Sequence, residues 1–231
     1  MSKIKQLYVN GCSFTNDPVI YYTNKQKQYC DFFKDKYQFD VINRGVPGSC
    51  NRRIIRTTLR DCLQFDSTTV VILQLTSLYR TEVDSLDQSW QNDDYFDPSQ
   101  EEIFRSVKIA DDSNSKPVKD FIKSKSKVVS EKQMFDELMV DLVMLTSYLE
   151  SKDIRYFIYS HDYVSDPKLQ PHDSTFFRKI KDNKNITSFF EPLSYKLTND
   201  ECFYDTLHGH LTEKGHYEMF KQLDTLINIF D

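Results

Sequence analysis

Hydrophobic and polar residues follow one another in segments whose period and length separate strands from helices. Short apolar runs predict strands at 5–10, 39–43, 68–75 and 154–160. The run at 68–75, TTVVILQL, is almost wholly apolar and β-branched, which predicts a central strand buried on both faces. Apolar residues at helical spacing predict helices over 25–36, 51–64, 212–229 and a long segment capped by Ser130 or Glu131.

The order of these segments predicts the fold class. Strands alternate with helices, and polar, glycine-bearing loops follow the strands. This alternation is typical of a parallel sheet in a three-layer α/β/α domain. The chain of 231 residues is expected to form one such domain over 1–231. In such sheets ligands bind beyond the carboxyl ends of the strands.

Residues 81–130 depart from the alternation. They are polar, weakly periodic and rich in Ser, Asp and Lys. Long segments of this kind in compact domains are usually functional or disordered, so we expect an insertion, a lid or a mobile loop that selects the substrate.

All five glycines fall in three short segments, YVNGCSFT, NRGVPGSCN and DTLHGHLTEKGH. Glycine permits positive φ and close backbone approach, so the clustering marks places where the backbone adopts an unusual course. The first segment contains Ser13, and the third contains Asp205, His208 and His210. These residue types are those of a nucleophile, a general base and a carboxylate that orients the base.

Ser13 is therefore a candidate nucleophile, activated by an imidazole from the third segment. Glycine before it would let the strand turn sharply and leave the Ser13 N–H free. The turn at Pro47 and Gly48 could supply a second N–H, and two converging N–H groups are what an oxyanion needs. The alternative is that Ser13 is only a turn hydroxyl that caps a helix.

The three segments together resemble the sequence blocks of the SGNH/GDSL-type hydrolases, closest to a divergent branch whose first block is G-C-S-F-T. The resemblance covers the framework of the domain but not residues 81–130. It implies a flavodoxin-like sheet and metal-independent hydrolysis of esters, often acyl or acetyl groups on carbohydrates or lipids. It also implies that Ser13 is the nucleophile, and that the N–H groups of Ser13 and Gly48 form the oxyanion hole.

The chain departs from the family pattern at two places. In the family, an asparagine in the third block, after the central strand, usually supplies a third donor to the oxyanion. This chain has LTSLYR at that place, so the candidate substitutes are Thr76, Ser77 and Asn51. Asp205 and His208 match the D-x-x-H spacing of the family. His210 better matches the distance to the glycine of the next helix, so we favour His210 as the base and keep His208 as the alternative.

Arg80 and His161 are candidate substrate-binding residues because each follows a predicted strand. The alternatives are that Arg80 pairs with Glu82 and that His161 is a solvated loop residue. His216 is expected to pack or cap within the last helix. The buried small residues Cys12 and Cys50 need no chemistry.

Composition limits the partners of the chain. A net charge of −5 and a pI near 5.6 argue against a nucleic-acid surface. The arginines at 52, 53, 56 and 60 are interpreted as a solvated helix face. Five cysteines without a C-x-x-C pair predict free thiols in a reducing cytosol, and neither a signal peptide nor a membrane segment is evident. We expect a cytoplasmic enzyme without cofactor or metal, acting on a small-molecule or carbohydrate ester.

Two other function classes stay open. Asp205, His208, His210 and His216 could bind zinc in a metal-dependent hydrolase. A binding or structural protein with a degraded site is the other alternative, because fold alone does not determine function.

Overall fold

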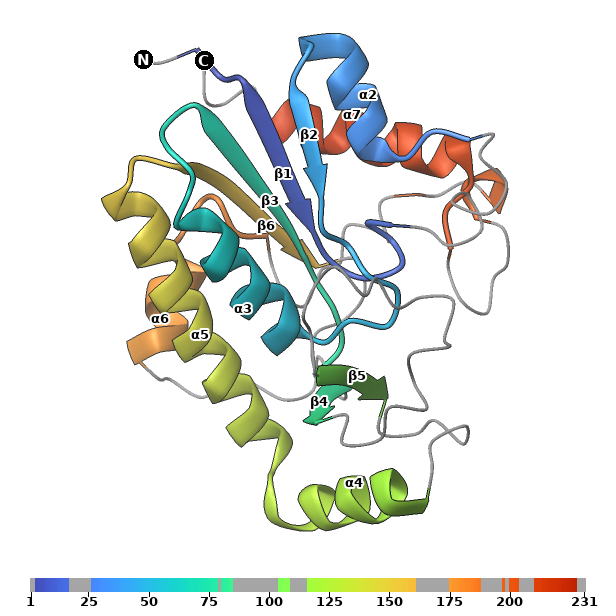
Figure 1. Cartoon of the computed structure of the whole chain (residues 1–231), viewed down its shortest axis with the longest axis vertical. Helices are drawn as coiled ribbons and strands as arrows, with labels where there is room; N and C mark the ends of the chain where they lie inside the picture. Colours follow the sequence, from blue (N-terminus) through green and yellow to red (C-terminus); the bar gives the residue numbers. More distant parts are fainter. Residues whose placement is uncertain are drawn as a thin grey trace.

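A parallel four-stranded sheet forms the centre of the protein (Figure 1). The structure is a computed structural model that describes residues 3–16, 26–78, 80–84, 104–108, 116–160, 175–187, 197, 200–203 and 210–227. The strands are β1 (Gln6–Asn10), β2 (Asp40–Asn43), β3 (Thr69–Leu75) and β6 (Arg155–Ser160), and their order across the sheet is β2–β1–β3–β6. After β6, Ile186 forms a parallel bridge to Ile158 at the sheet edge.

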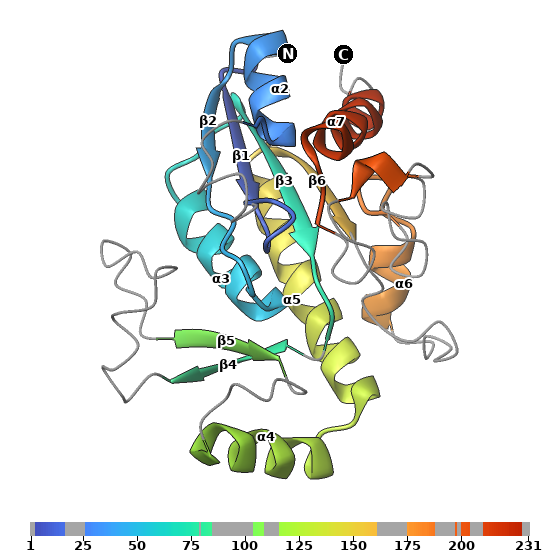
Figure 2. The same cartoon turned by 90° about the vertical axis from the view of Figure 1, so that its right-hand side faces the viewer.

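Helices cover both faces of the sheet, as the views in Figures 1 and 2 show. One layer contains α3 (Asn51–Cys62) and α5 (Glu131–Ser151), with α6 (Thr175–Lys181) packed against α5. The other contains α2 (Tyr29–Tyr37) and α7 (Glu213–Ile227), which pack against each other. Strand β1 shows the alternation, because Leu7 and Val9 pack with the α2 and α7 residues while Tyr8 packs on the α3 and α5 side. The predicted three-layer α/β/α fold is confirmed.

The predicted strands and the four predicted helices are present, with ends shifted by a few residues. β3 is buried at every position, as its apolar sequence predicts. The α5 helix begins after Ser130, whose hydroxyl accepts the Gln133 N–H at 3.1 Å and so caps the helix. All five cysteines are free and buried. None of the helices in the described ranges is long and apolar enough to cross a bilayer.

The segment at 81–130 contains regular structure that the sequence pattern did not predict. β4 (Arg80–Asp84) pairs antiparallel with β5 (Phe104–Lys108), and α4 (Lys116–Val128) follows. These elements lie beyond the carboxyl ends of the central strands (Figure 1). Residues 85–103 and 109–115 lie outside the described residues. Selection of the substrate by this segment stays a prediction.

The strand order determines where a ligand site forms. The chain leaves β1 toward β2 through α2 on one face, and it returns from β2 to β3 through α3 on the other. The carboxyl ends of β1 and β3 therefore form the switch point of the sheet, where the connections diverge and leave a crevice. The loops after β1 and β2 both reach this edge.

Gly215 allows α7 to begin close to another backbone segment. The helix follows Thr212, whose hydroxyl accepts the Gly215 N–H at 3.2 Å. A Cβ atom at Gly215 would lie 2.2 Å from the carbonyl oxygen of Cys202, in the short helix η4 (Asp200–Cys202). Glycine is required here by space, because backbone atoms cannot move aside as a flexible side chain can.

We expect Gly215→Ala to lower the free energy of unfolding by about 2 to 3 kcal/mol, since overpacking outweighs the better helix propensity of alanine. Thr225→Ala, at an exposed position of the same helix, is the matched control and should raise it by about 0.5 kcal/mol. Urea unfolding of both variants measures the difference. Equal stabilisation by the two alanines would contradict the steric explanation.

Candidate active site

The turn after β1 is shaped by its close approach to β3. A Cβ atom at Gly11 would lie 2.2 Å from Thr15 Oγ1 and 2.7 Å from Gln74 Oε1. Its φ is not positive, as Gly48 is the only glycine in the described ranges with positive φ. The expected sharp turn after β1 therefore depends on glycine for space and not for φ.

Gln74 of β3 anchors this turn through hydrogen bonds to its side chain. Its side chain is fully buried, and its Oε1 atom accepts the Thr15 hydroxyl at 2.7 Å and the Cys12 N–H at 3.4 Å. The Cys12 carbonyl in turn accepts the N–H groups of Thr15 and Asn16 at 2.9 and 3.1 Å. The turn that carries Ser13 is thus closed on itself and attached to the central strand.

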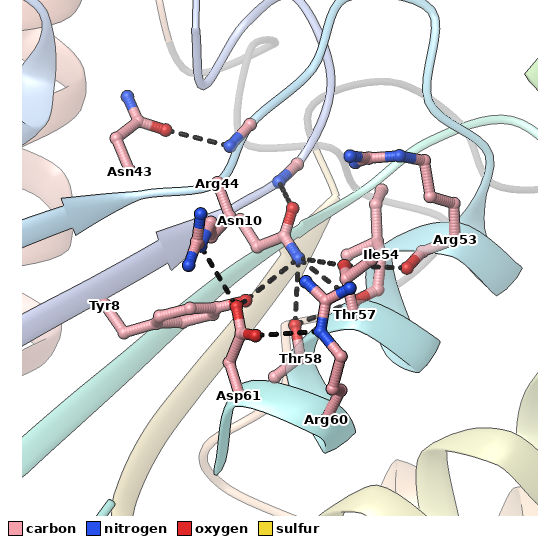
Figure 3. Close-up of polar contacts among 12 residues, drawn as sticks. Tyr8, Asn10, Asn43, Arg44, Arg53, Ile54, Thr57, Thr58, Arg60 and Asp61 are labelled. Atoms are coloured by element: carbon pink, nitrogen blue, oxygen red, sulfur yellow. Dashed lines mark hydrogen bonds and ion pairs between the residues drawn. The ribbon is translucent and has the colours of Figure 1, made fainter. Parts of the chain in front are cut away.

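Asn10 attaches the same turn to α3 (Figure 3). Its Oδ1 atom accepts the Gly11 N–H at 2.9 Å, and its Nδ2 atom lies 2.8 and 3.0 Å from the hydroxyls of Thr57 and Thr58. Both hydroxyls donate to carbonyls of α3, so their lone pairs are available to the Asn10 amide. The sequence analysis missed Asn10 and Gln74. A polar residue inside an otherwise apolar strand was the available signal.

Ser13 lies in this turn with 7% of its surface exposed. Within the described residues neither its hydroxyl nor its N–H forms a hydrogen bond, so it caps no helix there. A serine with an unoccupied hydroxyl and an unoccupied N–H has the groups that a nucleophile with an adjacent oxyanion donor requires.

The loop after β2 forms a second turn beside the first. The Ser49 N–H donates to the Val46 carbonyl at 3.1 Å, with Pro47 and Gly48 between them, and Gly48 has a φ of 79°. Proline followed by a residue of positive φ defines a type II turn, which favours glycine at the second position. The Gly48 N–H has no acceptor among the residues that the structure describes.

The two turns are joined directly. The Val46 N–H donates to the Gly11 carbonyl at 3.2 Å, and the Asn16 side chain donates to the Gly45 carbonyl at 3.0 Å. The segments that carry Ser13 and Gly48, far apart in the sequence, therefore lie side by side at the carboxyl edge of the sheet.

Asn51 and Thr76, two candidate oxyanion donors, are bonded to each other. The Asn51 amide donates to the Thr76 carbonyl and its Oδ1 atom accepts the Thr76 N–H, both at 2.7 Å. The Thr76 N–H is therefore occupied. The second amide hydrogen of Asn51 has no acceptor in the described part of the chain, so Asn51 keeps an unused donor.

His210 reaches the turn of the candidate nucleophile. Its ring packs edge-on against Phe14, the residue after Ser13, with the ring centroids 5.4 Å apart. No hydrogen bond joins Ser13 to His210. Asp205, His208 and His161 lie outside the described residues, so their predicted roles stay predictions.

His216 is a second histidine near this site, but it is buried in the core. It has no exposed surface, its ring stacks on Tyr29 at 6.3 Å, and neither ring nitrogen has a hydrogen-bond partner among the described groups. Burial, with a smaller contribution from His210, lowers the pKa of His216 to about 3. The expectation that His216 packs within the last helix is confirmed. Of the alternative zinc set, only His210 and His216 lie in described residues.

The row of arginines on α3 is not uniformly solvated. Arg52 and Arg60 are exposed, but Arg53 has only 5% of its surface exposed and donates to the Ser49 hydroxyl at 3.1 Å. The interpretation of the whole row as a solvated face is wrong for Arg53. Helical spacing shows which residues share a face, but not what packs over that face.

Arg80 begins β4 and lines a cleft of about 380 Å³ beside Asn51. Its guanidinium donates to the Ser49 carbonyl at 3.3 Å. Glu82, the alternative partner, has no described side chain. The other polar side chains that line the cleft are Arg52, Lys125, Glu137 and Asp141. Burial raises the pKa of the Asp141 carboxyl, while the nearby Arg52 opposes that shift.

Comparison with known proteins identifies the fold but not a family. No protein-family model matches the chain, and no curated protein matches it in sequence. The psychrotrophic esterase EstA of Pseudoalteromonas sp., inhibited by monoethylphosphonate, matches with a TM-score of 0.54 at 12% identity, covering 98% of both chains. LAE5, an alpha/beta hydrolase enzyme from the metagenome of Lake Arreo, matches with a TM-score of 0.51 at 10% identity, covering 100% of this chain and 98% of that one.

A third similar structure is protein YxiM of Bacillus subtilis, with a TM-score of 0.53 at 13% identity. The match covers 98% of this chain but 56% of that protein, so this chain spans little more than half its length. At such identities the similarity shows a shared α/β/α fold.

The burial of His216 makes stability depend on pH. Its pKa of about 3 in the folded state lies below the ordinary value of 6.5, so between these values only the unfolded state takes up the proton. The free energy of unfolding should fall as the pH falls below 6.5, and this group should contribute a loss of about 2 kcal/mol by pH 5. Urea unfolding of wild type and His216→Phe at pH 5 to 8 should show a shallower pH dependence for the variant. Identical slopes would contradict a buried neutral His216.

Proposed function

We propose that this chain is a serine hydrolase of the SGNH type that cleaves an ester through an acyl-enzyme formed on Ser13. One observation carries the proposal. The N–H groups of Ser13 and Gly48 both lack an acceptor in the described structure, and they lie on two turns joined by the Val46–Gly11 hydrogen bond. Unoccupied backbone donors on adjacent, well-anchored turns are suited to stabilising an oxyanion.

In the proposed reaction, His210 accepts the proton of the Ser13 hydroxyl as the oxygen attacks the ester carbonyl. The Ser13 and Gly48 N–H groups donate to the oxyanion of the tetrahedral intermediate, with the free amide hydrogen of Asn51 as a third donor. His210 then gives its proton to the departing alcohol. A water molecule repeats the sequence and releases the acid. Asp205 orients the imidazole, and His208 is the alternative base.

The proposed substrate is an acyl or acetyl ester of a carbohydrate or another polar alcohol. The cleft beside Asn51 supports a polar alcohol, because charged side chains of both signs line it and hydroxyl groups both donate and accept hydrogen bonds. Arg80 lines this cleft, and His161 follows directly after β6 as a second proposed substrate-binding residue. Two proteins of similar fold are named as an esterase and a hydrolase, which fits this reaction class.

One observation favours a second candidate, a ligand-binding protein on the same fold. The Ser13 hydroxyl and the His210 ring form no hydrogen bond with each other. Catalytic hydrogen bonds are often long before substrate binds, so the serine hydrolase stays the first candidate.

A fluorophosphonate probe should label the wild-type protein, because it reacts with activated serines. Ser13→Ala should abolish the labelling and lower kcat for p-nitrophenyl acetate by roughly a thousandfold or more. Intact-mass spectrometry measures the adduct. Ser151→Ala, at an exposed serine at the end of α5, is the matched control and should label like wild type. An unlabelled wild type that does not hydrolyse the ester would favour the ligand-binding protein.

The base can be assigned by comparing two glutamine variants. His210→Gln should lower kcat by about a hundredfold or more, because glutamine cannot take the Ser13 proton, while His208→Gln should keep most of the activity. Steady-state kinetics of both variants measures the difference. The reverse order would assign the base to His208 and leave the reaction class unchanged.

A further inference from the structure

Two arginines from different elements converge on Ser49, the last residue of the turn that contains Gly48. Arg53 of α3 donates to the Ser49 hydroxyl at 3.1 Å, and Arg80 of β4 donates to the Ser49 carbonyl at 3.3 Å. The Ser49 hydroxyl in turn donates a hydrogen bond to the Val46 carbonyl at 2.7 Å. Both ends of the Val46–Ser49 turn are thus held by side-chain hydrogen bonds.

Among the described residues, no hydrogen bond holds the central peptide of this turn, between Pro47 and Gly48. Gly48 is exposed, and no atom lies within 4 Å of a Cβ built there, so the outer side of the turn is open at this residue. Types I and II differ mainly by a flip of that peptide, and glycine is compatible with both. In the flipped turn the Gly48 N–H would point to the opposite side. The described hydrogen bonds that constrain this turn are those at its ends, so they bear on where this N–H points.

Arg53 is a buried cation at the start of α3. It lies in the first turn of α3, where the helix dipole disfavours a positive charge, and that turn contains no acidic residue. It is also buried, which opposes a charged group further. Its hydrogen bond to the Ser49 hydroxyl connects this buried side chain to the turn.

We propose that Arg80, supported by Arg53, is a positioning residue that keeps the Val46–Ser49 turn in the type II conformation and so directs the Gly48 N–H toward the oxyanion. This role rests on the proposed function. It differs from direct substrate binding by Arg80, which the sequence suggested and which the place of Arg80 in the cleft also allows. Positioning acts on the transition state and changes kcat, whereas uniform binding of the substrate changes KM.

The test compares Arg80→Met, Arg80→Lys and Gly48→Ala in steady-state ester hydrolysis. Arg80→Met should lower kcat by about ten- to a hundredfold with KM within about twofold of wild type, and Gly48→Ala should show the same pattern. Arg80→Lys should recover most of kcat, because one donor to a carbonyl does not require the planar fork of arginine. Arg60→Met is the matched control, since Arg60 is an exposed arginine of α3 that pairs with Asp61 (Figure 3). It should leave both constants unchanged.

A double variant tests whether Arg80 acts through Gly48. Arg80→Met combined with Gly48→Ala should be little worse than Gly48→Ala alone, because alanine disfavours the positive φ of residue 48 and both changes turn the same N–H away from the oxyanion. If the double variant instead lowers kcat by the product of the two single effects, the inference is wrong.

The amide resonance of Gly48 in ¹H–¹⁵N spectra is a readout that does not depend on activity. The chain has five glycines, so their signals are few, and the signal that is lost in Gly48→Ala is that of Gly48. Arg80→Met should shift or broaden this signal and Arg60→Met should not. Urea unfolding tests whether each variant folds. If Arg80→Met does not fold, Arg80→Lys provides a milder change at the same position.

The outcomes separate the two proposals. If wild type shows no turnover that depends on Ser13, the proposed function fails and the positioning role falls with it. If turnover depends on Ser13 but Arg80→Met raises KM and leaves kcat unchanged, Arg80 binds substrate and the positioning role is wrong. Unchanged kcat, KM and Gly48 resonance would also overturn the inference while leaving the proposed function intact.

Discussion

The close packing of Gly11 against β3 is the constraint on which the rest of the candidate site depends. Gln74 and Thr15 occupy the space where a side chain at Gly11 would lie, and they bond to each other across it. The turn after β1 can pass directly over the central strand only because residue 11 lacks a Cβ. That course places Ser13 at the switch point of the sheet and sets the Gly11 carbonyl where Val46 can reach it.

From this contact the site extends outward through hydrogen bonds to backbone groups. Asn10 joins the first turn to α3, Val46 joins the second turn to the first, and Asn51 joins the start of α3 to the end of β3. Each of these residues satisfies at least one backbone group near the core that would otherwise be unpaired. The Ser13 and Gly48 N–H groups are exceptions within the described loops, which is why they carry the proposed chemistry.

Much of the fold was predictable because burial imposes a period on the sequence. The apolar run of β3 and the stripe on α5 need only local information, and both elements are present. The elements between β3 and α5 were not predicted, because β4 and β5 are short and polar and form a separate two-stranded sheet in the described part of the chain. The interpretation of Arg53 as a solvated residue was wrong for another reason. A helical spacing of arginines does not show which of them the loop after β2 will cover.

The three-layer fold follows from the sequence pattern alone, and the clustered glycines indicate the loops of the candidate site. Periodicity and the steric freedom of glycine are properties of a residue and its near neighbours, so they can be read along the chain. The contacts of the folded chain were needed to show that Gly11 is required for space, that Gln74 and Asn10 hold its turn, and that Arg53 and Arg80 meet at Ser49. Those facts depend on contacts between residues far apart in the sequence, which form only when the sheet brings its loops to one edge.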